Sequence, residues 1–131
     1  DLETPDGRGR YPDAGFVMSN GNKCNAKILD RLYEVIVSRR DADPDKSYTA
    51  KLFSRGTGKI AQKVGEEAVE ALIEAVRGDK KALTEESADL LYHLLVLWAD
   101  SKVKASDVWS TLEMRFDSSG GIDEKKAWLK D

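Results

Sequence analysis

Two pairs of acidic residues repeat the same short spacing. Glu67 and Glu70 lie three positions apart in "KVGEEAVEALIEA", and Glu86 and Asp89 do so in "ESADLLYHLLVLW". Residues three apart on a helix share one face, so the two side chains of each pair can reach one ion. Residues 85–98 are apolar nearly all round at helical period, which is typical of a buried helix. Because burying a carboxylate without a partner is costly, these side chains need a compensating charge.

The two acidic pairs are predicted to face each other across antiparallel helices. One helix is expected over residues 58–77, and the next ends near residue 100. The connection "GDKKALT" is so short that the helices should form an αα-hairpin, with residues 70–74 level with residues 86–89. Four converging carboxylates repel one another unless a cation shares the site. Oxygen ligands without thiolates or an imidazole pair favour Mg²⁺ or Mn²⁺.

Basic residues precede the first acidic pair. Lys63 and Lys59 lie one and two helical turns before Glu67, and Arg55 precedes them in a predicted loop. A row of cations leading to a metal site suits a polyphosphate chain, whose oxygens the cations bind. The alternative for each lysine is a solvated side chain or an i, i+4 pair such as Lys63 with Glu67, which stabilises a helix only slightly.

The remaining elements complete an all-α bundle of about four helices around the central antiparallel pair. The first helix should follow Asn25 and end before Pro44, and a short helical turn is expected over residues 48–53. On the helix over residues 58–77, we expect the core face at Val64, Ala68, Leu72 and Ala75. The last helix is expected over residues 107–116. Candidate N-caps for the five segments are Asn25, Ser47, Thr57, Asp79 or Thr84, and Ser106.

Composition excludes several classes of function. With 131 residues and a net charge of -3, the chain is predicted to be one domain without an electrostatic footprint for nucleic acid or an anionic membrane. The single cysteine, Cys24, cannot form an intramolecular disulfide, which indicates a reduced, cytoplasmic location. The longest apolar run is too short to span a membrane. We divide the chain into an irregular arm or linker over residues 1–27, an all-α domain over residues 28–117 and a C-terminal tail over residues 118–131.

The blocks "SYTAKLF", "KIAQKVGEEAVE" and "ADLLYHLLVLW" resemble the phosphoribosyl-ATP pyrophosphohydrolases of histidine biosynthesis. That family belongs to the MazG-like all-α nucleoside triphosphate pyrophosphohydrolases, whose signature is Glu-Glu-x-x-Glu followed by Glu-x-x-Asp. The residues that match the signature are Glu66, Glu67, Glu70, Glu86 and Asp89. The resemblance extends from about residue 28 to residue 108.

The resemblance implies Mg²⁺-dependent hydrolysis of phosphoribosyl-ATP to phosphoribosyl-AMP and pyrophosphate by a homodimer or larger homo-oligomer. Glu66 would be a further metal ligand or the base for the attacking water. The residues expected to bind the metal are Glu67, Glu70, Glu86 and Asp89, and those expected to bind phosphate are Lys59, Lys63 and Arg55. Catalytic roles are therefore assigned to Glu66, Glu67 and Glu70.

Several interpretations stay open. His93 lies on the acidic stripe, which favours an orienting or substrate-contacting role over a purely structural one. Tyr48 and Phe53 could stack on a base or serve in packing. A house-cleaning hydrolase of free nucleotides would share the acidic signature, and a non-enzymatic helical interaction module would pair the acids with lysines. A ferritin-like dimetal oxidase is disfavoured because Asp89, rather than a histidine, follows Glu86 at i+3.

Overall fold

The computed structural model describes residues 24–118 and Trp128. Within this part of the chain all regular structure is helical, which confirms the all-α class. The helices are α1 (Lys27–Ser38), α2 (Tyr48–Arg55), α3 (Thr57–Arg77), α4 (Lys80–Asp100) and α5 (Ala105–Ser118). Most of the predicted arm and nearly all of the predicted tail lie outside the described residues.

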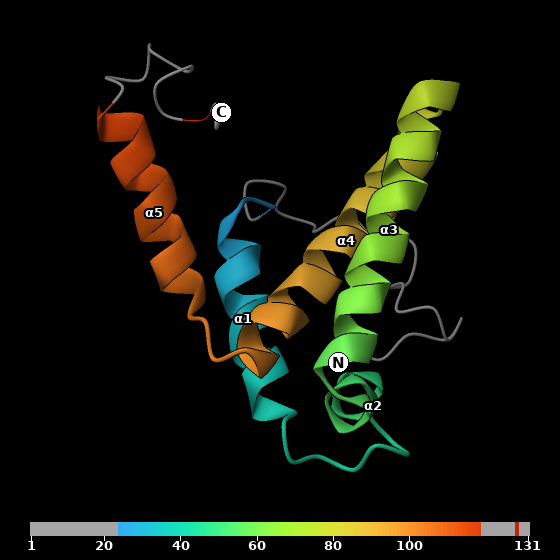
Figure 1. The fold of residues 1–131 in the computed structure, drawn as a ribbon, viewed down its shortest axis with the longest axis vertical. Helices are drawn as coiled ribbons and strands as arrows, with labels where there is room; N and C mark the ends of the chain where they lie inside the picture. The colour runs from blue at the N-terminus through green and yellow to red at the C-terminus, as the bar shows by residue number, and fades with distance from the viewer. Residues whose placement is uncertain (1–23, 119–127, 129–131) are drawn as a thin grey trace.

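The central pair of helices is the hairpin that the sequence predicts. α3 and α4 run antiparallel along each other, and Gly78 ends α3 in the left-handed region with a φ of 78°. Glycine adopts this conformation without a Cβ clash, so it suits the end of a helix. Asp79 then caps α4 by accepting a hydrogen bond from the Ala82 amide at 2.9 Å. Figure 1 shows α1 beside α4 and α2 at the end of the pair opposite the turn.

The other predicted caps have different outcomes. Ser47 caps α2, since its hydroxyl accepts from the Ala50 amide at 3.0 Å. The predicted short turn is a full helix of eight residues that ends at Arg55, so the described part of the chain contains five helices. Thr57 is already the first residue of α3, and its hydroxyl instead donates to Asp100. Ser106 likewise lies inside α5, which begins at Ala105.

The hydrophobic core lies where α1, α2 and the start of α3 meet the second half of α4. Arg40, just after α1, supports it, because its guanidinium donates to the Ala99 carbonyl and lies 5.2 Å from the centre of the Phe53 ring. The buried members of this core are Ile36, Leu52, Ile60, Tyr92, Leu95, Val96 and Ala99.

No helix in the described part of the chain is long and apolar enough to cross a membrane.

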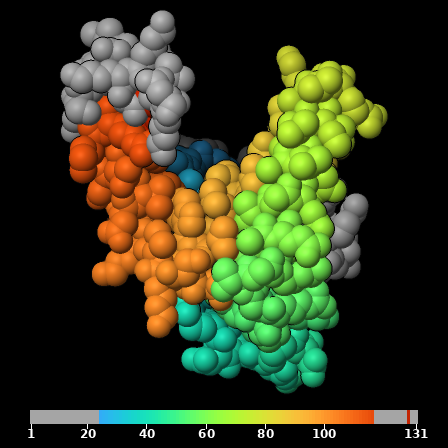
Figure 2. Space-filling view, in the orientation of Figure 1, coloured from blue at the N-terminus to red at the C-terminus, as the bar shows by residue number. Residues whose placement is uncertain are grey.

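The predicted core face of α3 is wrong at Leu72 and Ala75, whereas Val64 and Ala68 are half-buried. Leu72 is 56% exposed and Ala75 is exposed too, whereas the buried residues of α3 are Ile60 and Glu67. The helix therefore turns its acidic strip toward α4 along with Ile60, and it turns four other apolar side chains away from α4. The apolar strip on its opposite side, called the outer strip below, consists of Val69, Leu72, Ile73 and Val76. In Figure 2, no described helix covers the side of α3 (green) that is visible and faces away from α4. The upper ends of α3 and α5 lie apart in this view.

Candidate metal and phosphate site

Carboxylates from both central helices meet on the inner side of the hairpin. Glu67 of α3 is 5% exposed, and Glu86 and Asp89 of α4 are 6% and 3% exposed. Residues three apart on each helix share a face, and the short turn keeps these two faces level with each other. Most of the signature is thus buried in a region where apolar side chains would ordinarily pack.

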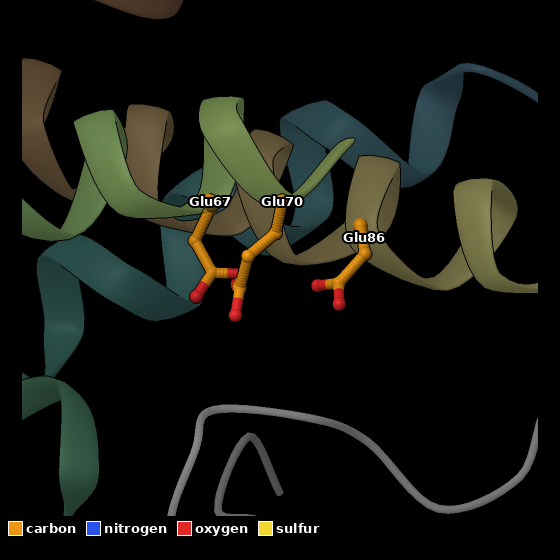
Figure 3. Close-up of side chains that lie close together, drawn as sticks. All are labelled: Glu67, Glu70 and Glu86. Carbon is orange, nitrogen blue, oxygen red and sulfur yellow. The ribbon is translucent and has the colours of Figure 1, made fainter. Parts of the chain in front are cut away.

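Three glutamates of the two central helices form one cluster. Glu67, Glu70 and Glu86 each offer a carboxylate oxygen, and the three oxygens lie within 4.8 Å of one another. Figure 3 shows the three side chains projecting to the same side of the helix pair, two from α3 and one from α4. Asp89 is not part of this close set, but its charge raises the pKa of Glu67.

Burial and the neighbouring carboxylates disfavour the ionised form of Glu67. Burial raises the pKa of Glu67 most, followed by the charges of Glu70, Asp89 and Glu86, and together they bring this pKa to about 8 in spite of a lowering by Lys63. The Oε2 atom of Glu67 is buried and accepts no hydrogen bond. A divalent cation removes both penalties at once, since it replaces the proton and takes up the lone pairs. The residues present therefore fit a hard, oxygen-bound cation such as Mg²⁺.

Glu66 stands apart from the cluster. Its side chain is exposed and accepts a hydrogen bond from Gln62 Nε2 at 2.8 Å, and Lys63 Nζ lies 3.7 Å from its Oε1. The hydrogen bond from Gln62 is the main cause that lowers the pKa of Glu66, and Lys63 and Lys59 add to it. Glu66 thus presents an ionised carboxylate next to the cluster but outside it.

The predicted phosphate-binding residues approach the cluster from one end of α3. Lys63 is half-buried, and its charge lowers the pKa of Glu67, although the ion pair that it forms is with Glu66. Lys59 is half-buried one turn earlier, whereas Arg55 is exposed at the end of α2. The row of cations thus follows α2 and α3 toward the carboxylates, and phosphate binding by its members stays a prediction.

His93 is fully buried, and both of its ring nitrogens are engaged. Nδ1 lies 2.8 Å from the Asp89 carbonyl oxygen, and Nε2 lies 3.1 Å from the Tyr48 hydroxyl. The Tyr92 ring packs edge-on against the imidazole, with 4.9 Å between centroids. Burial lowers the pKa of His93, so the ring is neutral at physiological pH. This arrangement makes His93 a neighbour of the cluster rather than a candidate ligand.

The contact of Tyr48 with His93 is a feature of the site that the sequence did not predict. Burial, and next the charge of Glu67, raise the pKa of its phenol to about 12, and Asp89 contributes as well. The side chain lies against Tyr92, with the ring centroids 6.2 Å apart. The sequence interpretations were base stacking or packing, and no local pattern links Tyr48 to a histidine 45 positions away.

Comparison with known proteins agrees with this geometry. A sequence model described as phosphoribosyl-ATP pyrophosphohydrolase matches residues 29–116. The phosphoribosyl-ATP pyrophosphatase of Azospirillum brasilense is 61% identical over 106 residues, which cover 81% of this chain and 95% of that protein. The proteins of the same name from Paramagnetospirillum magneticum and Roseobacter denitrificans are 60% and 54% identical, cover 81% and 78% of this chain, and are each covered over 96% of their length. The chain therefore belongs to the phosphoribosyl-ATP pyrophosphohydrolase family.

Proposed function

We propose that this chain hydrolyses the α–β phosphoanhydride of phosphoribosyl-ATP, releasing phosphoribosyl-AMP and pyrophosphate in the second step of histidine biosynthesis. The observation that carries the proposal is the convergence of Glu67, Glu70 and Glu86 in a chain whose relatives bear the name of this activity. Membership of an enzyme family argues against the non-enzymatic interaction module. We place the reaction in the cytoplasm, with a small-molecule substrate and neither nucleic acid nor membrane as partner.

The acidic residues have a defined task in this proposal. Glu67, Glu70, Glu86 and Asp89 would hold Mg²⁺, with Mn²⁺ as a substitute. The bound ion supplies neutralisation of the triphosphate charge and activation of the attacking water. Glu66 remains ionised at neutral pH because its pKa is lowered, so it is available to accept a proton from that water or to bind a further ion.

The basic residues bind the part of the substrate that leaves. Lys63 and Lys59 project from α3 on the approach to the carboxylates, and Arg55 lies at the end of α2. Cations placed in this order attract a chain of phosphates and hold its oxygens in charge-assisted hydrogen bonds. Binding the triphosphate along this row directs its anhydride toward the carboxylate cluster.

The proposed enzyme is a homodimer. The outer strip leaves four apolar side chains exposed on one helix, and Val76 is 85% exposed. Contiguous apolar surface of this kind marks an interaction site. The same strip on a second chain is its chemical complement, as a two-fold symmetric interface requires. We therefore propose that the outer strip is the contact of a homodimer.

Pyrophosphate release from different substrates tests the activity. Purified protein with Mg²⁺ should release pyrophosphate from phosphoribosyl-ATP and much less from ATP, dATP or a non-standard nucleoside triphosphate. A chelator should stop the reaction, and renewed Mg²⁺ or Mn²⁺ should restore it. Equal rates on all triphosphates would replace the proposal by the house-cleaning hydrolase, which shares the acidic signature.

A further inference from the structure

A buried line of hydrogen bonds joins α2 to α4 beside the carboxylate cluster. It runs from the Tyr48 hydroxyl to His93 Nε2 over 3.1 Å, and from His93 Nδ1 to the backbone carbonyl oxygen of Asp89 over 2.8 Å. The imidazole is 0% exposed, so water does not compete for either nitrogen. One end of the line is thus Asp89, a candidate metal ligand, and the other end is Tyr48, the first residue of α2.

The chemistry of the two end groups fixes the direction of both bonds. A backbone carbonyl oxygen can only accept, so Nδ1 of His93 must carry the proton. A neutral imidazole with its proton on Nδ1 has a lone pair on Nε2. The Tyr48 hydroxyl therefore donates to Nε2, and its pKa of about 12 keeps its proton in place at physiological pH.

We propose that Tyr48 and His93 act as a positioning pair for the metal site, with His93 locked in its Nδ1–H tautomer between the Tyr48 hydroxyl and the Asp89 carbonyl. The pair holds the turn of α4 that carries Asp89 against the start of α2. His93 is then neither a metal ligand nor a proton donor in the reaction. The hydrogen-bond directions do not depend on the proposed function, but the effect of the pair on metal binding rests on it.

The direction of the Tyr48 bond also affects the carboxylates. A phenol has one proton, so a hydroxyl that donates to Nε2 cannot donate to a carboxylate at the same time. Tyr48 lies close enough to Glu67 for that charge to act on it, and Glu67 Oε2 accepts no hydrogen bond. His93 thus engages the Tyr48 proton, which leaves Oε2 of Glu67 available to a cation.

A second bond between the same helices provides a matched control. The hydroxyls of Thr49 and Tyr92 lie 2.5 Å apart, and both residues are buried. Tyr48→Phe and Tyr92→Phe each remove one phenol that links α2 to α4, by the same chemical change. Only Tyr48→Phe interrupts the line to His93 and Asp89, so a purely structural role predicts the same outcome for both variants.

The tautomer can be measured directly because the chain contains a single histidine. A long-range ¹H–¹⁵N spectrum of the metal-free protein should show a protonated Nδ1 and a lone-pair nitrogen at Nε2. In Tyr48→Phe the Nε2 signal should move to higher ¹⁵N frequency, because its lone pair loses its donor. In Tyr92→Phe it should stay in place. A wild-type protein with its proton on Nε2 would overturn the proposal.

Mg²⁺ titration calorimetry tests the effect on the ion. Loss of a group that supports metal ligands commonly weakens binding by ten- to a hundredfold, so Tyr48→Phe should bind Mg²⁺ about tenfold more weakly than wild type. Tyr92→Phe should remain within about twofold. Equal losses in the two variants, or no loss in Tyr48→Phe, would contradict the positioning role. If wild type binds no Mg²⁺, the proposed metal chemistry fails, and the spectrum still decides the hydrogen-bond directions.

Discussion

The two sides of α3 differ in a way that reverses the usual arrangement. The side toward α4 carries Glu67 and Glu70, whereas the side away from it carries the outer strip, whose members Leu72 and Val76 are 56% and 85% exposed. In an ordinary surface helix the apolar side faces the core and the charged side faces water. The reversal places buried carboxylates between the two helices and leaves apolar side chains of the outer strip exposed.

Both sides are costly in an isolated, metal-free chain. On the inner side, burial and mutual repulsion raise the pKa of Glu67 to about 8. On the outer side, apolar side chains remain partly in water, and complete burial of a fully exposed side chain of this kind contributes roughly 1.5–3 kcal/mol. A cation relieves the first cost and a second copy of the chain relieves the second. Changes to each side therefore test separate parts of the proposal.

The largest effect is expected on the inner side. Glu86→Gln removes one carboxylate of the cluster while keeping the size of the side chain. We expect turnover of phosphoribosyl-ATP to fall about a thousandfold, which corresponds to roughly 4 kcal/mol of lost transition-state stabilisation. Initial rates of pyrophosphate release at saturating Mg²⁺ measure this effect.

The neighbouring residue supplies the control for this change. Glu85 is exposed and lies outside the cluster, so Glu85→Gln should keep activity within about twofold. Circular dichroism should show the same helical content in both variants, because neither change removes packing. A Glu86→Gln protein that unfolds would mean that this carboxylate is structural, and one that retains wild-type turnover would mean that the reaction does not need it.

A somewhat smaller effect is expected on the outer side. Leu72→Lys places a charge in the centre of the outer strip and, in a dimer, does so twice. We expect the dissociation constant of the dimer to rise about a hundredfold, or roughly 3 kcal/mol. Sedimentation velocity over a range of protein concentrations measures the change. The control is Val37→Lys, at an apolar residue of α1 that is 39% exposed, which should leave the dissociation constant unchanged. A wild-type protein that is monomeric at all concentrations would refute the role of the outer strip.

The same two sides show what the sequence can and cannot predict. The i, i+3 spacing of the acids and the short turn are local features, and they were sufficient to predict the hairpin and the meeting of Glu67, Glu70 and Glu86. The core face of α3 was wrong at Leu72, because periodicity identifies an apolar stripe but does not say which neighbour covers it. The contact of Tyr48 with His93 joins residues 45 positions apart, and such contacts depend on how helices pack.

Metal binding should stabilise the inner side measurably. A ligand that binds only the folded state at a hundred times its dissociation constant adds about 2.7 kcal/mol to the free energy of unfolding. For a domain of this size, that amount raises the melting temperature by roughly 10 °C. Differential scanning calorimetry with and without Mg²⁺ measures the shift. When proteins of the same oligomeric state are compared, Leu72→Lys should show the same shift in melting temperature as wild type, whereas Glu86→Gln should show little. A wild-type melting temperature that Mg²⁺ does not change would contradict a preformed site.

The smallest effect concerns the pH dependence of the metal-free protein. The pKa of Glu67 is about 8 in the folded chain against an ordinary value of 4.5, so between these values the folded state holds a proton that the unfolded state has lost. The contribution of this group is therefore complete below pH 4.5 and disappears as the pH rises through 8.

The most informative window is pH 7 to 8.5, because it lies above the ordinary pKa of His93, whose folded value is lower still. In this window urea unfolding should show a wild-type stability that falls with pH, while Glu67→Gln, which resembles the protonated side chain, should fall less. Glu85→Gln should keep the wild-type slope, and Mg²⁺ should remove it by replacing the proton. A slope unchanged in Glu67→Gln would mean that the buried carboxylates are compensated within the chain itself. The inner side of α3 would then not require a cation, and the contrast with the outer strip would be one of packing alone.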